Sequence, residues 1–337
     1  MRRRNLLALL TAVALASGAA GCGGASPASS GPQKTILRLA LNQTKEHPSY
    51  IALTSFGDRL EKATDGRFTI DIFPNEVLGA QQEILNLMSN GIVDLAIISG
   101  TQLENINRDF QVFNLPAVFD SVAHQTKVIN DPEITRQLFT SMEGSNRLTV
   151  IGGFTQGERN LYTKTPVNSP ADLAGKKIRV QESPVMLATI DAMGASATPM
   201  SYGEVYTAMQ SGVLDGAENN EVSYYTQKHY EVARYYTYTK HLVGLDYMVG
   251  NTDSLHAMSE QDKAAFDREW TATYQEFNDL WAKATQDAID GATKGGAKFV
   301  KIDTSAFDAR LKPVAESFLR TDVQREIYAK TRKAAEQ

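Results

Sequence analysis

The stretch DAMGASATPMSYGEVYTAMQSGVLDGAENN, residues 191–220, describes one helix and the strand after it. Ser201 and Glu204 have the spacing of a capping box, which predicts that a helix starts here. Gly212 predicts the end of that helix, because glycine adopts the left-handed conformation that closes helices. A strand is expected next, and Asn219 should lie just past its end, where a loop between a strand and a helix can present an amide to a ligand.

A second segment repeats the end of this stretch. NGIVDLA at 90–96 and SGVLDGA at 211–217 share a helix-ending glycine, two aliphatic residues, an aspartate and an alanine, with a constant offset of 121 residues. Seven residues can match by chance. The alternative is a chain with two lobes of related plan, each with its own sheet.

Periodicity elsewhere predicts an α/β fold. Residues that alternate between apolar and polar predict strands, and segments with helical spacing between them predict helices. Strands that alternate with helices imply parallel βαβ units. The strands are expected at 36–42, 69–73, 94–99 and 177–180, and the helices at 50–63 and 80–89.

The C-terminal third begins with a long amphipathic helix. Ser259 and Asp262 mark its start, and aromatic residues and alanines then recur at three- and four-residue spacing to about Asp290. Thirty or so residues span ~45 Å at 1.5 Å each, enough to lie across both lobes. We interpret the aromatic stripe as core packing.

Residues 1–34 read as an export leader and a tether. Three arginines precede an apolar run that is too short for a membrane span, and small residues then lead to Cys22, which is the only cysteine. Residues 1–21 are therefore predicted to be a lipoprotein signal peptide, with Cys22 as the acylated N-terminus and residues 22–34 as a flexible tether. The alternative is an ordinary signal peptide that happens to carry a cysteine.

Composition and charge exclude several classes of protein. The 337 residues are 42% hydrophobic and 22% charged, which is ordinary for a globular protein. Loss of three arginines with residues 1–21 moves the formal charge from −5 to −8, which argues against nucleic acid as a partner. The sequence has no metal-binding histidine spacing, nucleophile elbow or phosphate-binding loop, so we expect neither an enzyme nor a bound cofactor or metal.

The stretch at 191–220 resembles the signature of the DctP family, the solute-binding proteins of tripartite ATP-independent periplasmic (TRAP) transporters. The resemblance runs from about residue 36 into the C-terminal helices. Further matching segments are FPNEVLG (73–79), NGIVDLA (90–96), VFNLPAVF (112–119), GERNLYT (157–163), PADLAGKKIRV (170–180) and HYEVARY (229–235).

This resemblance implies a periplasmic-binding-protein-like fold, type II-like, in which two α/β lobes close over a ligand and a long helix spans both. Lobe I would be 35–156 with 245–284, and lobe II 157–244 with 285–337. Members of the family bind small organic anions and deliver them to a membrane permease of a large and a small subunit for ion-gradient-driven uptake. An ABC-type receptor and a sensor subunit that presents its ligand to a membrane kinase remain alternatives.

In lobe II the resemblance implies a carboxylate clamp. Arg179 should point away from its core-facing neighbours in the strand, and its planar fork suits a carboxylate. Arg159 matches a second family arginine, with a salt bridge to a lobe II acid as the alternative. Asn219 is expected to contact the ligand. Tyr202 occupies an aromatic position that closes on the ligand, with packing at the helix start as the alternative.

In lobe I the candidate ligand-binding residues are less specific. Asn42 ends the first strand, His47 lies in the loop after it, and Gln81 and Ser99 take positions that often face the cleft. Together with Tyr202, these polar groups favour a hydroxylated sugar acid over a four-carbon dicarboxylate. The sequence thus predicts a binding protein for a small carboxylate, exported and held at the membrane through Cys22.

Overall fold

The computed structural model describes residues 34–335. The predicted signal peptide, Cys22 and all of the predicted tether except Lys34 lie outside the described residues. None of the helices within 34–335 is both long and apolar enough to cross a membrane.

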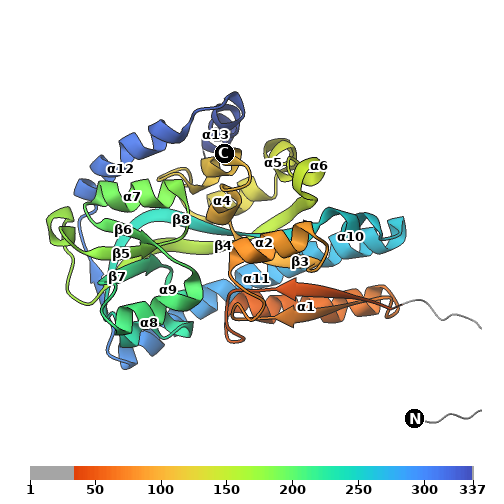
Figure 1. The fold of residues 1–337 in the computed structure, drawn as a ribbon, viewed down its shortest axis with the longest axis horizontal. Coiled ribbons are helices and arrows are strands. Elements are labelled where there is room, and N and C mark those ends of the chain that lie inside the picture. The colour runs from red at the N-terminus through yellow and green to blue at the C-terminus, as the bar shows by residue number, and fades with distance from the viewer. Residues whose placement is uncertain (1–33, 336–337) are drawn as a thin grey trace, which may run out of the picture. The chain divides into compact units, whose positions relative to one another are not determined.

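The first part of the chain alternates strands and helices as predicted (Figure 1). Its strands are β1 (Thr35–Ala40), β2 (Phe68–Phe73), β3 (Leu95–Ser99) and the long β4 (Leu148–Thr163). Its helices are α1 (Pro48–Ala63), α2 (Gln81–Ser89), α3 (Gly100–Leu103), the 3-10 helix η1 (Arg108–Asn114), α4 (Val122–Ile129), α5 (Pro132–Phe139) and α6 (Glu143–Asn146).

The second part repeats the alternation and ends in helices. Its strands are β5 (Lys177–Val180), β6 (Ser196–Pro199), β7 (Gly216–Asn219), the long β8 (Tyr235–Asn251) and β9 (Lys298–Lys301). Its α-helices are α7 (Pro184–Met193), α8 (Val205–Gln210), α9 (Glu221–Thr226), α10 (Thr252–His256), α11 (Glu260–Lys294), α12 (Ser305–Phe318) and α13 (Asp322–Ala334). The 3-10 helices are η2 (Pro170–Leu173), η3 (Tyr202–Glu204) and η4 (His229–Glu231).

The strands form one sheet with an internal symmetry. Its order is β2-β1-β3-β8-β4-β7-β5-β6, and β9 pairs with β8. β1 runs parallel to β2 and β3, and β3 pairs antiparallel with β8. In the other half β5 runs parallel to β6 and β7, and β7 pairs antiparallel with β4. We call β2-β1-β3 the first half-sheet and β7-β5-β6 the second half-sheet.

This topology confirms the related plan of the two halves and corrects one expectation. The repeated segments at 90–96 and 211–217 lead into β3 and β7, which hold equivalent places on the two sides of the β8–β4 pair. The expectation of a separate sheet in each half is wrong. β4 and β8, with 16 and 17 residues, pair along most of their length and so join the halves through one ladder of hydrogen bonds.

Apolar residues cover both faces of the sheet. Along β1, Leu37 and Leu39 pack on the face covered by α1 and α11, whereas Ala40 packs on the opposite face with α2. The same alternation holds in β3. Because side chains of a strand point alternately to its two faces, each half-sheet becomes the middle layer between two layers of helices.

The predicted long helix is confirmed. α11 has 35 residues, about 52 Å at 1.5 Å each, and the side chain of Ser259 accepts a hydrogen bond from the Asp262 backbone N–H at its start. It contacts α1 beside the first half-sheet and α9 beside the second, and Figure 1 shows it running along that side of the sheet. It therefore ties the two halves together.

One helix start differs from its prediction. Ser201 and Glu204 bond to each other, side chain to side chain at 2.5 Å, and neither caps the backbone. Residues 202–204 form a 3-10 turn, and α8 begins only at Val205. The capping-box prediction is therefore wrong, because the two side chains satisfy one another.

Candidate functional site

Arg179 is a buried cation without a carboxylate partner among the described residues. It lies on β5 between Ile178 and Val180, which pack in the core as predicted, and it is only 3% exposed. Its Nε and Nη2 donate to the Met200 carbonyl oxygen at 2.9 and 2.6 Å. Its guanidinium carbon lies 5.6 Å from the centre of the Tyr202 ring. Burial lowers the pKa of Arg179, since a charge away from water is costly.

Arg159 has a partner. On β4, its Nε and Nη2 contact the two carboxylate oxygens of Glu218 at 2.6 and 2.7 Å. His241 lies 3.4 Å from the same carboxylate. Burial raises the pKa of Glu218, but Arg159 and His241 outweigh it and hold that pKa at about 2. The structure thus forms the salt bridge that was the alternative for Arg159, and contact with a ligand stays a prediction.

Tyr202 and Asn219 lie together beside Arg179. The Asn219 amide donates to the Tyr202 hydroxyl at 3.3 Å, and both side chains are buried. Burial raises the pKa of Tyr202, while the charges of Arg179 and Arg159 oppose that shift, which places both arginines near the ring. The four residues predicted for lobe II therefore come together, although no described contact is with a ligand.

The first half-sheet contributes a group of polar side chains. Asn42 follows β1 with a buried oxygen that has no hydrogen-bond partner among the described residues. The Gln81 carbonyl oxygen accepts from the Ser99 backbone N–H at 2.6 Å, which joins the start of α2 to the end of β3. The Ser99 hydroxyl lies 3.1 Å from that of Thr101. Asn42, Gln81 and Ser99 thus gather at the carboxyl ends of β1 and β3.

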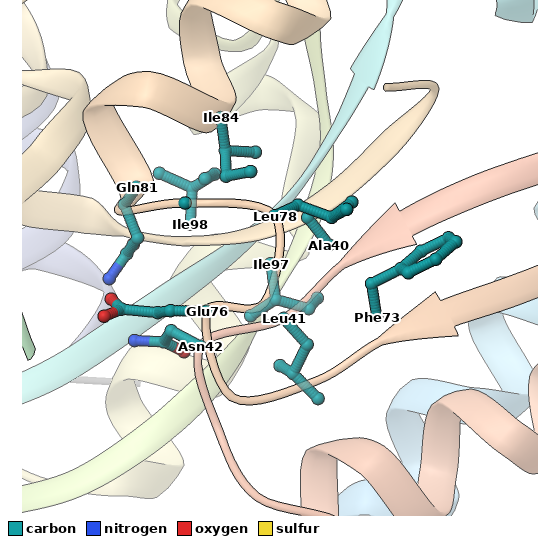
Figure 2. A pocket seen from close by; sticks show the side chains of 11 residues that line it. Ala40, Leu41, Asn42, Phe73, Glu76, Leu78, Gln81, Ile84, Ile97 and Ile98 are labelled. Carbon is teal, nitrogen blue, oxygen red and sulfur yellow. The ribbon is translucent and has the colours of Figure 1, made fainter. Parts of the chain in front are cut away.

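A small cavity lies at this edge of the sheet. Asn42, Glu76 and Gln81 line it, and Figure 2 shows their polar ends gathered on one side of it. Its other walls are apolar, with Ile97 and Ile98 among them. Its volume is about 10 Å³, room for one water molecule, so an organic acid must lie beyond the polar ends of these side chains.

His47 takes a structural position. Its Nδ1 accepts from the Ser49 backbone N–H at 3.2 Å and so caps α1, and its ring meets Trp281 edge-on at 5.8 Å. Burial lowers the pKa of His47 to about 3, so the ring is neutral at neutral pH. The structure records no contact between His47 and the other predicted site residues, and its role as a ligand contact stays a prediction.

Sequence reasoning missed Glu76. This residue lies in the loop between β2 and α2, and its Oε2 accepts from the Gly203 backbone N–H at 2.8 Å, next to Tyr202. Glu76 therefore connects the polar group of the first half-sheet with that of the second. In the sequence, FPNEVLG is one of the segments that carry the family resemblance, and the glutamate after its Pro-Asn turn is the signal that could have identified Glu76.

A second group that sequence reasoning missed lies behind Asn219. Asn220 donates to the Gln156 side-chain oxygen at 3.1 Å, and the Gln156 amide donates to Asp246. Burial raises the pKa of Asp246 to about 7, against the opposing effects of Arg159 and Gln156. This chain of hydrogen bonds runs from the start of α9 through β4 to β8, so it couples the site to the two strands that both halves share.

Metal binding finds no support in the part of the chain that the structure describes. Residues 34–335 contain no group of three histidine, cysteine, aspartate or glutamate side chains that could hold a metal ion. The site offers one unpaired guanidinium, one tyrosine and several amides. This chemistry suits an organic anion, because guanidinium binds the carboxylate and the amides bind polar substituents.

Known proteins that are similar to this chain include one that binds an organic anion. The family model for "Bacterial extracellular solute-binding protein, family 7" (DctP) matches residues 39–322. A TRAP periplasmic solute-binding protein from Anaerococcus prevotii, solved with bound α/β-D-glucuronate, is 35% identical with a TM-score of 0.86; the match covers 90% of this chain and 99% of that one.

Two curated relatives are also similar. A solute-binding protein of Chromohalobacter salexigens is 34% identical over 81% of this chain and 81% of its own length. The C4-dicarboxylate-binding periplasmic protein DctP of Vibrio cholerae is 30% identical over 65% of each chain. The name of the second relative specifies a C4-dicarboxylate, whereas the name of the first specifies no ligand. Similarity alone therefore does not identify the ligand of this chain.

Proposed function

This chain belongs to the bacterial extracellular solute-binding proteins of family 7 (DctP), which are binding proteins of transporters and not enzymes, and from that premise we propose that it captures a small sugar acid outside the cytoplasm. The bound acid is then handed to a TRAP permease of the membrane. The ligand lies between the two half-sheets, with its carboxylate on Arg179.

The observation that carries this proposal is the unpaired guanidinium of Arg179. Arginine has five N–H donors, and two of those of Arg179 serve the Met200 carbonyl. Three remain for a ligand. A carboxylate there would restore part of the solvation that burial removes and would form charge-assisted hydrogen bonds.

A sugar acid fits the remaining side chains better than a short diacid does. Glu76 lies near enough to Arg179 for that charge to lower its pKa, and Asn42 and Gln81 line the same cavity as Glu76. All three side chains can hydrogen-bond to hydroxyl groups. The similar protein from Anaerococcus prevotii holds D-glucuronate, a six-carbon acid with one carboxylate and several hydroxyls. Contacts to both half-sheets would then favour the closed arrangement, as a ligand that bridges two lobes shifts their equilibrium.

The test compares D-glucuronate with D-glucose, which differs from it only at C6. Titration calorimetry and thermal unfolding of the purified chain should show binding and a rise in melting temperature with D-glucuronate and neither effect with D-glucose. A ligand at a hundred times its dissociation constant stabilises the native state by about 2.7 kcal/mol. A response to D-glucose equal to that with D-glucuronate would refute the carboxylate site, and no response to either sugar or to other small acids would refute the proposed ligand class.

Delivery to a permease requires a test in cells. Deletion of the gene should abolish uptake of the acid and leave any transcriptional response of the cell to the acid unchanged. Loss of a transcriptional response with uptake intact would instead favour a sensor subunit.

Attachment to the membrane through Cys22 is a further part of the proposal. An acylated Cys22 would hold the chain at the outer face of the membrane, with residues 23–34 as a spacer. Mass spectrometry of the mature N-terminus should find a lipid-modified cysteine, and Cys22→Ser should move the protein from the membrane fraction to the soluble fraction. A mature chain that starts elsewhere and is soluble in the wild type would contradict the anchor.

A further inference from the structure

The loop that carries Glu76 holds it in an uncommon backbone conformation. Asn75 and Glu76 both have positive φ, 57° and 55°, which costs energy for residues other than glycine. Backbone hydrogen bonds fix the turn: Asn75 N–H donates to the Gln43 carbonyl at 2.9 Å and Glu76 N–H to the Leu41 carbonyl at 3.2 Å. Strained residues that the surroundings fix in this way occur often at ligand sites.

The turn directs the Glu76 carboxylate toward η3, the 3-10 helix that follows β6 of the second half-sheet. Its Oε2 accepts from the Gly203 backbone N–H, and a Cβ on Gly203 would lie only 2.9 Å from that oxygen. A side chain at residue 203 would require only the end of the flexible Glu76 side chain to shift. Glu76 thus reaches the part of the site where Tyr202 and Arg179 lie.

Glu76 is the only charged side chain among those that line the small cavity. Burial raises its pKa, which the Gly203 N–H and the charge of Arg179 oppose. Asn42, which lines the same cavity, has a buried amide oxygen without a hydrogen-bond partner among the described residues.

These oxygens define what the far end of a ligand must be. Carboxylate and amide oxygens accept hydrogen bonds, so they are satisfied by hydroxyl donors. A second ligand carboxylate has no proton to donate at neutral pH and would meet the Glu76 charge in a buried site, where like charges repel strongly. An acid held by Arg179 can therefore present hydroxyl groups to Glu76 and cannot present a carboxylate.

We propose that Glu76 determines specificity by hydrogen-bonding a hydroxyl group of the ligand and by repelling acids that carry a second carboxylate. This inference rests on the proposed function, and it narrows the ligand class to hydroxylated monocarboxylates. It sets this chain apart from a dicarboxylate receptor on the same fold.

The test measures a ratio of affinities by titration calorimetry of the purified chain. The two probes are D-glucuronate and D-glucarate, of which D-glucarate has a carboxylate at both ends. The wild type should bind D-glucuronate at least about a hundredfold more tightly. Glu76→Gln should weaken D-glucuronate about five- to tenfold, since a neutral amide oxygen replaces the charged acceptor of the hydrogen bond. It should also strengthen D-glucarate, so that the ratio falls at least tenfold.

Two further variants keep the result interpretable. Glu204→Gln removes the same charge from an exposed residue next to Gly203 and should leave the ratio within about twofold of the wild type, because exposed charges are screened. Glu76→Asp keeps the charge on a shorter side chain, so it should lose D-glucuronate affinity and still reject D-glucarate. It also serves if Glu76→Gln does not fold, as circular dichroism would reveal.

The outcomes separate the two proposals. An unchanged ratio in Glu76→Gln, with both affinities lowered equally, would mean that Glu76 only holds the half-sheets together and would overturn this inference. A wild type that binds D-glucarate or succinate as tightly as D-glucuronate would overturn it as well. In both cases the proposed carboxylate site stands, whereas a wild type that binds no acid at all refutes both.

Discussion

Arg179 and Arg159 both lie on strands and are both buried, but only Arg159 has a carboxylate partner among the described residues. Arg159 meets Glu218 with two parallel hydrogen bonds, so its charge is balanced within the protein. Arg179 has a single backbone carbonyl and the face of Tyr202. A buried cation with so little compensation raises the energy of the unliganded protein, and an anionic ligand lowers it.

Replacement of Arg179 should therefore affect binding more than folding. Arg179→Ala should weaken D-glucuronate about 30-fold to several thousandfold, the effect of removing one partner of a buried charge pair. Arg179→Lys should also bind poorly, because an ammonium group cannot reproduce the planar fork. Calorimetry on both variants measures this, and affinity equal to the wild type in Arg179→Ala would exclude the clamp.

Replacement of Glu218 should affect folding more than binding. Glu218→Gln leaves the Arg159 guanidinium buried without its counter-charge, and breaking a buried pair costs about 3–5 kcal/mol. Urea denaturation should show this loss in the absence of any ligand. Lys240→Gln is the matched control: it breaks the exposed pair with Glu158, which is worth at most about 1 kcal/mol. Equal stability of the two variants would contradict the structural role of the Arg159–Glu218 pair.

Among the elements, α11 and β4 determine how the halves meet. β4 has an irregularity between Thr155 and Glu158, where Gly157 adopts a φ of 60°. A Cβ at Gly157 would lie 3.2 Å from the Trp281 ring of α11. The bulge also falls at the predicted boundary between the lobes, after residue 156. Trp281 thus packs on the β4 backbone at this bulge.

Truncation of Trp281 should reduce the stability of the whole chain. The side chain is 7% exposed and packs on Phe277 and His47 at 5.5 and 5.8 Å between ring centres. Loss of a buried aromatic side chain costs about 3–5 kcal/mol. Trp281→Ala should show this in urea denaturation, whereas Lys283→Ala on the exposed face of the same helix should change stability by less than about 0.5 kcal/mol. A loss below about 1 kcal/mol in Trp281→Ala would show that α11 does not hold this junction.

At the scale of the whole molecule, several buried groups retain their uncharged forms. Burial raises the pKa of Glu104 to about 8 and the pKa values of Glu221 and Asp246 to about 7. Burial also lowers the pKa values of His47 and His229 to about 3. The acids bind protons more tightly in the folded chain than in the unfolded one, and the histidines bind them less tightly.

These shifts predict that stability falls between pH 6.5 and 8. The ordinary pKa of histidine is about 6.5, so the unfolded chain still releases histidine protons just above pH 6.5, and this offsets a small part of the loss. The unfolded chain has already released the protons of Glu104, Glu221 and Asp246, whose ordinary pKa is near 4, and the folded chain releases them only as pH rises through about 7 to 8. Stability is therefore lost over this range, by about 1–3 kcal/mol in total.

Chemical denaturation at the two pH values measures this loss. Asp246→Asn removes one of the titrating groups and should make the loss smaller. Stability that is constant or rises from pH 6.5 to 8 would contradict the buried, protonated state of these carboxyls.

The sequence alone determined the α/β alternation, the strands β1, β2, β3 and β5 and the long helix α11, and it offered repetition between the halves as one of two interpretations. Periodicity fixes which residues of a strand share a face, so the outward orientation of Arg179 followed from its core-facing neighbours. The same holds for α11, whose aromatic spacing requires a buried stripe. These are local properties, because side-chain direction in a strand or helix depends only on position within it.

Only the tertiary structure decided which of these side chains meet. Glu218 lies 59 residues from Arg159 and Gly203 lies 127 residues from Glu76, so neither contact leaves a local pattern. The sequence also could not separate one sheet from two, since β4 and β8 join the halves through pairing along their length. Contacts between distant segments depend on how the whole sheet is ordered, and that order is set by packing many elements at once.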